Sequence, residues 1–577
     1  MNKTGAWLVR YALEQLGINH TFGIPGVQNA EIYDQLSQSD SITPHLVNHE
    51  MSAAFMADAV SRTHAGSVGA MVIVSGSSVT HSASGIGEAL LAGVPMLIIA
   101  GSGHRDQVPQ IDQEQIVKAL TKAYFKIDAH KQIVETLFHA YSIATGDSPG
   151  PVFVEIPLHI QLLSADVDDP LPSHPAAPKN PELIVSDADI TAAATQLLQA
   201  KNPGILVGWG AVDAHAELIA VAEHIAAPVC TTLSGISSFP ASHPLHAGML
   251  FGPAAVPSAE NAFNDCDCLI AIGTDFSNID TASGSAEPPE MLIHIDRNEQ
   301  TFNQRYDAKI TLCGSPKEVL TALLYKLQEQ MHSPRDAGEI VAAIKRDKLA
   351  LKNDWYNHNS KGRVNPAVFF DHLRDCLKDD AIIVTDDGNH TFLAAELMPI
   401  NHPRGFISPS KFNAMGYCIP AVNAAKLVNP EKQVVVGIVG DGAMLMTGME
   451  ALTGVRNNLG TIYCIFNDGQ LSRITQSQQV NDRQRKYTKV GNVNWGAFAD
   501  AIDCGYIPIT NNNDVATGLR HALETAAQGQ PVFVDIAIDY SRRSNYALGV
   551  VKANLAKFSG RDKLRIVSRA IVRKFIG

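Results

Sequence analysis

The sequence predicts an α/β protein with three doubly wound parallel-sheet domains. Short runs rich in Val and Ile alternate with longer segments rich in Ala, Leu and Glu, a pattern typical of repeated βαβ units. The length of 577 residues suits three or four domains of roughly 150 residues each. Buried strands are predicted at Ala70–Val74, Met96–Ala100, Val152–Ile156, Gly204–Val207, Cys268–Ile272, Leu292–Ile295, Ile382–Thr385, Val434–Val439, Thr461–Phe466 and Val532–Ile536.

Two segments with the composition of linkers set the domain boundaries. Residues 165–181 are rich in Pro and Asp, and residues 330–337 are polar and precede a charged helix. The predicted domains are therefore 1–165, 185–330 and 360–545.

The two outer domains contain a similar segment near their ends. Gly150–Ile156 and Gln530–Ile536 share a Pro-Val-Phe-Val run followed by an acidic residue and Ile. The similarity arises either by chance or because the outer domains are related and face each other across a site.

Composition excludes several classes of protein. The net charge of -13 argues against a general nucleic-acid binder, because such binding depends on Lys and Arg neutralising phosphates. The eight cysteines include no CxxC pair or Cys/His cluster of a zinc site. The N-terminal residues predict an amphipathic helix rather than a signal peptide, and apolar runs such as Met96–Ala100 are far shorter than a membrane span of about 20 residues. We expect a cytoplasmic protein.

The most specific motif lies in the third domain. A Val/Ile-rich strand leads directly into Gly440-Asp441-Gly442-Ala443, and a helix is predicted at Met444–Leu452. Glycines at such a turn let backbone N–H groups approach an anion. Asp441 adds an oxygen ligand of the kind that Mg²⁺ prefers.

A second motif, Asn467-Asp468-Gly469, follows the next predicted strand, and Asn467 lies 26 residues after Asp441. This spacing corresponds to one helix and one strand. Because ligands bind at the carboxyl ends of parallel strands, Asp441 and Asn467 are predicted to lie side by side at a metal and phosphate site.

Together these motifs resemble the thiamine-diphosphate motif of the acetohydroxyacid synthase, pyruvate oxidase and pyruvate decarboxylase group. The resemblance implies that the three domains are a pyrimidine-binding domain, a central Rossmann-like domain and a diphosphate-binding domain. It implies thiamine diphosphate and Mg²⁺ as cofactors, with Asp441, Asn467 and the backbone carbonyl of Gly469 as metal ligands. Gly440, Gly442 and Ala443 would contact the diphosphate.

The resemblance extends over nearly the whole chain. Phe22–Gly26 is similar to the opening loop of the family, with Gly26 as a cofactor contact, and His49–Ala59 is similar to the start of its catalytic helix. Asn413–Ala421 resembles the family's GTMGFGLPA segment, and Leu245–Leu250 and Ile293–Asp296 match its central domain.

Glu50 is the catalytic residue that the resemblance implies. A carboxyl group hydrogen-bonded to the distal nitrogen of the cofactor's pyrimidine makes the imino form of that ring accessible. We expect the apolar neighbours Met51, Ala53 and Ala54 to raise the pKa of Glu50 by desolvation.

Further cofactor contacts are implied by two loops of the third domain. Met415 would be the apolar residue that keeps the two cofactor rings folded together. Gly388, Asn389 and His390 follow a predicted strand and resemble a loop on the diphosphate side.

Three residues near this site depart from the family pattern and are candidate substrate contacts. Gln28 stands where related lyases carry His, and Gln110 follows a Pro where acetolactate-forming relatives have Gln-Glu. His81 stands where relatives often have Asn, and is either a specificity element or a surface substitution.

The central domain carries only a fragment of a dinucleotide-binding turn, Gly208-Trp209-Gly210. Asp275 occupies a position where flavin-binding relatives tend to have Arg. Since an acidic side chain would repel a nucleotide phosphate, the sequence predicts that FAD is not bound.

The basic tail, residues 552–577, contains eight basic residues and one acidic residue. Leu564, Val567, Ile571 and Phe575 share one helical face. The tail is either an interfacial helix that makes peripheral membrane contact or a helix docked on the enzyme's own acidic surface.

The expected reaction is decarboxylation of a 2-oxo acid, with pyruvate as the first candidate, and carboligation to a second carbonyl, as in acetolactate synthase. Alternatives are a simple 2-oxo acid decarboxylase, a lyase that cleaves a 2-hydroxyacyl or hydroxyketone substrate, and an inactive regulatory homologue. The resemblance also implies a homo-oligomer with active sites at subunit interfaces, because Glu50 and the metal motif lie in different domains.

Overall fold

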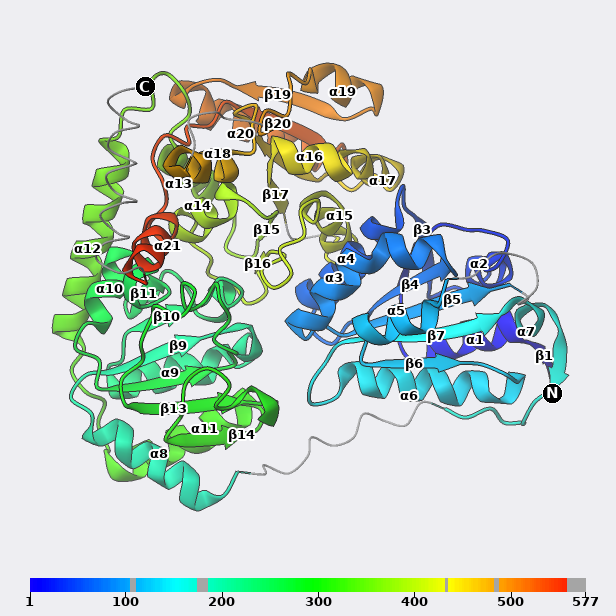
Figure 1. The fold of residues 1–577 in the computed structure, drawn as a ribbon, viewed down its shortest axis with the longest axis horizontal. Helices are drawn as coiled ribbons and strands as arrows, with labels where there is room; N and C mark the ends of the chain where they lie inside the picture. Colours follow the sequence, from blue (N-terminus) through cyan, green and yellow to red (C-terminus); the bar gives the residue numbers. More distant parts are fainter. Residues whose placement is uncertain (104–110, 174–184, 431–433, 482–486, 558–577) are drawn as a thin grey trace.

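The computed structural model describes residues 1–103, 111–173, 185–430, 434–481 and 487–557. They form three six-stranded sheets flanked by helices (Figure 1). All strand pairs within these sheets are parallel. The predicted fold class is confirmed.

The N-terminal sheet has the strand order β3-β2-β4-β5-β7-β6. Its strands are β2 (His20–Gly23), β3 (Thr43–Leu46), β4 (Gly69–Val74), β5 (Met96–Ser102), β6 (Ala123–Lys126) and β7 (Pro151–Pro157). Its helices are α1 (Gly5–Gln15), α2 (Ala30–Ser37), α3 (Glu50–Thr63), α4 (Ser77–Ala92), α5 (Gln113–Leu120), α6 (Ile133–Thr145) and α7 (Leu158–Leu162). A small antiparallel ribbon pairs β1 (Asn2–Thr4) with β8 (Ser164–Asp166).

The central sheet has the order β11-β10-β9-β12-β13-β14, the 3-2-1-4-5-6 order of a Rossmann fold. Its strands are β9 (Pro203–Val207), β10 (Val229–Thr231), β11 (His246–Met249), β12 (Cys268–Ile272), β13 (Met291–Asp296) and β14 (Ile310–Cys313). Its helices are α8 (Asp187–Gln199), α9 (His215–Ile225), α10 (Pro257–Phe263) and α11 (Pro316–Gln330). The long helix α12 (Gly338–Tyr356) packs against α10 and leads into the C-terminal domain (Figure 1).

The C-terminal sheet has the order β16-β15-β17-β18-β20-β19. Its strands are β15 (Ile382–Thr385), β16 (Phe406–Ile407), β17 (Val435–Gly440), β18 (Ile462–Phe466), β19 (Gly505–Ile509) and β20 (Val532–Ile536). Its helices are α13 (Pro366–Cys376), α14 (Asn389–Leu397), α15 (Cys418–Val428), α16 (Asp441–Thr447), α17 (Ala451–Arg456), α18 (Ser472–Asn481), α19 (Trp495–Ala501), α20 (Val515–Ala527) and α21 (Asn545–Ala556).

The two outer sheets share one topology. Numbered from the first strand of each, both have the order 2-1-3-4-6-5. The two similar sequence segments form β7 and β20, which occupy equivalent positions in the two sheets. The acidic residue of each strand accepts a hydrogen bond from a tyrosine of the neighbouring edge strand: Tyr124 donates to Glu155 at 2.9 Å, and Tyr506 donates to Asp535 at 3.0 Å. The similar sequence segments therefore belong to two domains with the same sheet topology.

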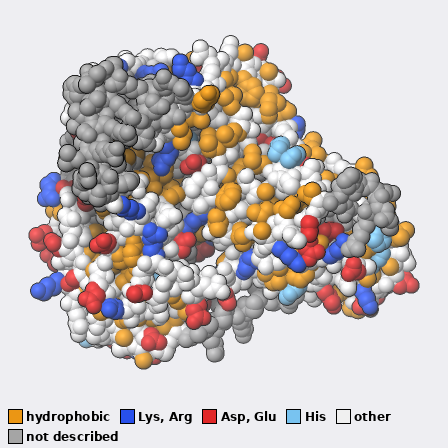
Figure 2. Space-filling view, in the orientation of Figure 1, with side chains coloured by type: hydrophobic (Ala, Val, Ile, Leu, Met, Phe, Trp, Pro, Cys, Tyr) orange, Lys and Arg blue, Asp and Glu red, His pale blue; other side chains and the backbone are white. Residues whose placement is uncertain are grey.

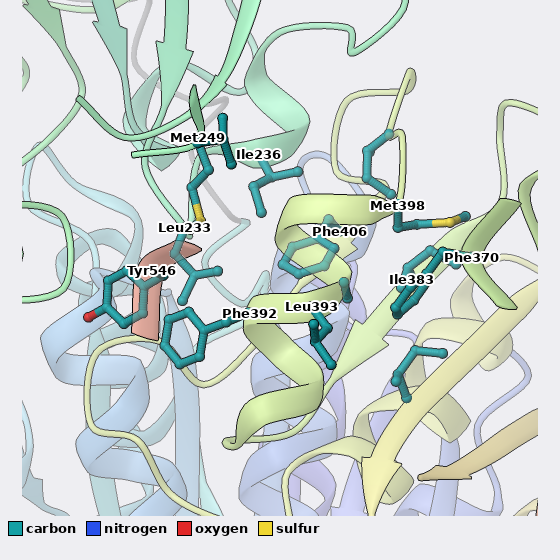
Figure 3. Close-up of a cluster of buried hydrophobic side chains, with 14 of the residues drawn as sticks. Leu233, Ile236, Met249, Phe370, Ile383, Phe392, Leu393, Met398, Phe406 and Tyr546 are labelled. Atoms are coloured by element: carbon teal, nitrogen blue, oxygen red, sulfur yellow. The ribbon is translucent and has the colours of Figure 1, made fainter. Parts of the chain in front are cut away.

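The central and C-terminal domains share a hydrophobic core (Figure 3). Leu233, Ile236 and Met249 of the central domain belong to the same buried cluster as Phe392 and Met398 of the C-terminal domain. Burial of this apolar surface holds the two domains together.

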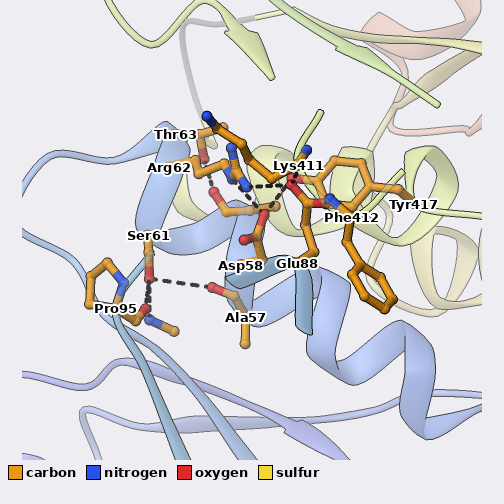
Figure 4. Close-up of polar contacts among 12 residues, drawn as sticks. Ala57, Asp58, Ser61, Arg62, Thr63, Glu88, Pro95, Lys411, Phe412 and Tyr417 are labelled. Atoms are coloured by element: carbon orange, nitrogen blue, oxygen red, sulfur yellow. Dashed lines mark hydrogen bonds and ion pairs between the residues drawn. The ribbon is translucent and has the colours of Figure 1, made fainter. Parts of the chain in front are cut away.

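The N-terminal domain packs on the C-terminal domain through α3 and α15, and a buried ion-pair network lies at this contact (Figure 4). The guanidinium of Arg62 contacts Asp58 at 2.7 Å and Glu88 at 3.1 Å, and all three side chains are at most 2 % exposed.

Residues of the C-terminal domain complete the hydrogen bonds of this network. The hydroxyl of Tyr417 donates to Asp58 at 2.6 Å, and the backbone N–H of Phe412 donates to Glu88 at 2.7 Å. The network therefore requires both domains.

Arg62→Met is expected to destabilise the protein by about 3–5 kcal/mol, because it leaves two buried carboxylates without their cation. The measurement is the shift of the denaturant-unfolding midpoint. Lys118→Met removes the exposed pair with Glu114 and should cost at most about 0.5 kcal/mol. Equal midpoints for the two variants would contradict the expectation.

Candidate functional site

The predicted phosphate motif lies at the end of β17, at the carboxyl edge of the C-terminal sheet. β17 ends at Gly440 and α16 begins at Asp441, so the helix starts three residues earlier than predicted. It ends at Thr447, and a 3₁₀ turn at Gly448–Glu450 separates it from α17. The turn is closely packed: a Cβ on Gly440 would lie 3.2 Å from the ring of His390.

Asp441 and Asp468 lie close together at this edge. The carboxylate of Asp441 accepts hydrogen bonds from the backbone N–H groups of Gly442 at 2.8 Å and Gly469 at 2.7 Å. Burial, and then the nearby charge of Asp468, raise the pKa of Asp441 to about 6. Burial also raises the pKa of Asp468. A carboxylate whose charge is disfavoured by burial and by a second carboxylate is suited to a cation.

The two motifs border a pocket of about 100 Å³. Its lining residues all lie between 387 and 540 and are Asp387, Gly388, Asn389, His390, Met415, Gly440, Asp441, Gly442, Ala443, Phe466, Asp468, Gln470, Leu471, Ser472, Arg473, Ile474 and Tyr540. Asn389 Nδ2, His390 Nε2 and Asp468 Oδ1 are buried atoms for which no hydrogen-bond partner is recorded among the described residues. Since buried polar atoms are normally paired, the pocket has the donors and acceptors for a polar group that carries both phosphate and metal.

Asn467 and Gly469 are held beside this pocket. The side-chain nitrogen of Asn467 donates to Asp535 at 2.9 Å, so its amide oxygen lies on the opposite side of the group. The carbonyl of Gly469 accepts from the backbone N–H of Val490 at 3.1 Å. Gly469 has a φ of 76°, which favours glycine at this turn.

Met415 lines the pocket on a loop that is fixed by Asp386. The buried carboxylate of Asp386 accepts from the backbone N–H groups of Gly416 at 2.9 Å and Cys418 at 2.8 Å. Burial raises the pKa of Asp386 to about 7 against these hydrogen bonds. Asp386 is a functional residue without a predicted role, although a carboxylate directly after a buried strand is a usable signal.

Glu50 is the first residue of α3 and lies outside the lining of this pocket. Its carboxylate accepts from the hydroxyl of Ser78 at 2.6 Å, and its second oxygen contacts the ring of His81 at 3.0 Å. Burial raises the pKa of Glu50, but the hydrogen bonds from Ser78 and His81 outweigh it, and the pKa lies below its ordinary value. Desolvation therefore acts in the expected direction, but the expected net rise in the pKa of Glu50 is wrong.

The candidate substrate residues lie apart from the pocket or outside the described chain. The side chain of Gln28 accepts from the backbone N–H of Ser75 at 3.1 Å, just before α4, the helix that carries Ser78. The backbone N–H of Gly26 donates to Asn29 at 2.7 Å. Gln110 and the preceding Pro109 lie outside the described residues.

Asp275 is paired with Lys411 at 2.5 Å. The lysine offsets much of the repulsion that Asp275 would exert on a phosphate. The absence of FAD thus stays a prediction.

No helix in the described part of the chain is long and apolar enough to cross a membrane. The first six residues of the basic tail include the end of α21, and residues 558–577 lie outside the described residues.

Comparison with known proteins identifies three matching family models. Residues 3–122 match the N-terminal thiamine pyrophosphate binding domain, residues 190–323 the central domain, and residues 386–536 the C-terminal thiamine pyrophosphate binding domain of thiamine pyrophosphate enzymes.

Similar proteins cover nearly the whole chain. A probable acetolactate synthase large subunit of Methanocaldococcus jannaschii is 30% identical over 93% of this chain and 92% of its own length. The acetolactate synthase large subunit of Corynebacterium glutamicum is 30% identical over 93% of this chain and 87% of its own. The isozyme 3 large subunit of Escherichia coli is 28% identical over 93% and 95%.

Proposed function

Because the chain belongs to the family of thiamine pyrophosphate enzymes, we propose that it decarboxylates a 2-oxo acid and ligates the remaining unit to a second carbonyl compound. Pyruvate is the proposed donor and acetolactate the proposed product, since relatives along 93% of the chain are named acetolactate synthases. The observation that carries the proposal is the pocket at Asp441, in which this buried carboxylate lies near the half-buried Asp468 and several buried polar atoms have no partner among the described residues.

The residues of this pocket fit thiamine diphosphate, the cofactor of the family. The buried side-chain nitrogen of Asn389 has no partner among the described residues and would donate to the diphosphate, and the ring of His390 would border it. Gly388, Gly440, Gly442 and Ala443 would let it approach the backbone. Asp441, Asn467 and the carbonyl of Gly469 would hold Mg²⁺, which relieves the repulsion between Asp441 and Asp468.

The remaining cofactor residues orient the rings and move one proton. When bound, the cofactor supplies a carbon nucleophile and an electron sink. Glu50 would hold the proton at the distal pyrimidine nitrogen, with Ser78 and His81 positioning its carboxylate. Met415 would pack against the two rings, and Gly26 would contact the cofactor from the N-terminal domain.

We propose that the complete site forms between two subunits. The pocket is lined by residues between 387 and 540, whereas Glu50 lies in the N-terminal domain. Large apolar side chains are exposed where the outer domains meet, including Leu445 at 49%, Met446 at 53% and Met449 at 49%. Figure 2 shows hydrophobic side chains gathered on this part of the surface. Such a patch is typical of a protein–protein interface.

The function is tested by incubating the enzyme with pyruvate, thiamine diphosphate and Mg²⁺. We expect release of CO₂ and formation of acetolactate, detected as acetoin after acid treatment. Acetaldehyde as the sole organic product would support a simple decarboxylase instead. Absence of CO₂ release from pyruvate and from a panel of other 2-oxo acids would contradict the proposal. Gln28, His81 and Gln110 remain the proposed substrate contacts.

A further inference from the structure

A second cavity lies between the central and C-terminal domains, away from the pocket at Asp441. It has a volume of about 270 Å³ and is bordered by β11, α12 and the end of α14. Most of its walls are apolar; these lining residues are Ile236, Ala247, Met249, Val256, Leu351, Ala367, Ala395, Leu397, Met398, Pro399 and Ile400. In Figure 3, Ile236, Met249 and Met398 lie in this region of the interface between the two domains.

One amine enters this cavity without a carboxylate partner. Lys348 of α12 donates to the carbonyl of Ala241 at 3.4 Å and contacts Nδ1 of His246 at 3.1 Å. Within the described part of the chain, no ion pair is recorded for Lys348 at 4.0 Å or less. Buried ammonium groups are normally paired, because an unpaired one loses its hydration without compensation.

The other charged groups that line the cavity already have partners. Both oxygens of Glu396 accept hydrogen bonds, from Trp355 at 2.9 Å and from the backbone N–H of Asn545 at 2.7 Å. Asp371 is paired with Lys352 at 2.7 Å. Among the described charged residues that line this cavity, Lys348 is therefore the one that could form an ion pair with a bound ligand.

The protonation states of Lys348 and His246 are consistent with an anion binding beside Lys348. Burial lowers the pKa of Lys348 to about 8, which still leaves the amine mostly charged at neutral pH. Burial, followed by the charges of Lys348 and His243, lowers the pKa of His246 well below its ordinary value, so its ring is neutral. An anion beside Lys348 would restore the stability of the charged amine.

We propose that this cavity binds a small aliphatic carboxylate, with its carboxylate on Lys348 and its hydrocarbon tail against the apolar walls. Ligand pockets combine apolar walls with a few polar groups that fix orientation, and the volume lies just below the usual range of roughly 300–1,000 Å³, which suits a small molecule.

The site has a direct structural link to the pocket at Asp441. α14 begins with Asn389 and His390, which line that pocket, and its last residues Ala395, Glu396 and Leu397 line the cavity. A ligand in the cavity therefore contacts the same helix that carries two residues of the cofactor pocket. The proposal does not depend on the reaction that the enzyme catalyses.

The test uses hexanoate as the probe and the holoenzyme with thiamine diphosphate and Mg²⁺. Binding is measured by isothermal titration calorimetry, with hexan-1-ol as the uncharged analogue. The wild-type protein should bind hexanoate saturably and more tightly than hexan-1-ol. Lys348→Met should weaken hexanoate binding by roughly tenfold to a hundredfold, the usual size of a charge-assisted hydrogen bond, and should leave hexan-1-ol binding unchanged.

Lys345→Met is the matched control, because Lys345 is exposed on the same helix. It should bind hexanoate as the wild type does. Lys348→Gln removes the same charge and replaces the Met variant if that variant does not fold. Absence of saturable hexanoate binding in the wild type, or equal affinity in the wild type and the Lys348 variants, would overturn the proposal.

Discussion

Glu50→Gln is expected to lower turnover by about 10²- to 10⁴-fold, the usual contribution of a positioned proton-transfer group. Gln keeps the shape of Glu50 and can still contact Ser78 and His81. It cannot hold the proton that the pyrimidine nitrogen requires. The loss should therefore appear in kcat, while binding of thiamine diphosphate, measured by circular dichroism titration, stays largely intact.

A matched control for this variant is Glu31→Gln. Glu31 is the acidic residue in the first turn of α2, as Glu50 is in the first turn of α3. The Glu31 variant should retain full turnover, because the macrodipole contribution of such a residue is small. Turnover of the Glu50 variant equal to that of the wild type would remove Glu50 from the mechanism.

Asp441→Ala is expected to abolish retention of the cofactor rather than to slow its chemistry. Removing even an outer-shell partner of a metal site commonly weakens the site by about 10- to 100-fold, and we expect a larger loss for a direct ligand. The measurement is the rise in the thermal midpoint on adding thiamine diphosphate and Mg²⁺, which ligand binding produces in the wild type. The variant should show no such rise.

The fold of the variant without ligands should be preserved. Burial and the charge of Asp468 hold the pKa of Asp441 above its ordinary value, so the ionised form of this carboxyl is disfavoured in the folded state. Removal of this unfavourable charge offsets the loss of the hydrogen bonds from Gly442 and Gly469, so the midpoint of the ligand-free protein should change little. Asp500→Ala, at an exposed position of α19, is the control and should respond to the cofactor as the wild type does. A normal ligand response of the Asp441 variant would contradict its role.

Mixing the two inactive variants tests whether the site lies between subunits. A dimer of one Glu50→Gln chain and one Asp441→Ala chain has one site with both residues intact if each site takes Glu50 from one chain and Asp441 from the other. Activity should then recover on mixing. If each site forms within one chain, both sites of the mixed dimer are defective and activity should stay low.

The sequence was sufficient for the central strands, and it placed the two motifs of the third domain after neighbouring strands, β17 and β18. All ten predicted strands are present, because short runs rich in β-branched residues have the length and composition of buried strands. The missed strands include every edge strand. Edge strands such as β3 (Thr43–Leu46) and β6 (Ala123–Lys126) are only partly buried and carry Pro, His or Lys, so their pattern is weak.

The contacts around the site were harder to predict than its residues. The GDG motif identified Asp441, but only the fold shows that Asp468 lies close enough to raise its pKa. In the same way, apolar neighbours in sequence suggested a raised pKa for Glu50. Ser78 and His81 come from another helix, and sequence spacing does not indicate that they reach its carboxylate.

The buried network at Arg62 has a consequence for synthesis of the chain. Glu88 and Lys411, whose backbone N–H also donates to Glu88, are separated by 323 residues. A ribosome that adds about 5–20 residues per second needs roughly 16–65 s to cover that distance. During this time Asp58 and Glu88 of the nascent N-terminal domain have Arg62 as their cation but lack the donors from the C-terminal domain. The apolar face of α3 that later packs on α15 is exposed as well. This domain should therefore complete its folding only after the C-terminal domain has emerged.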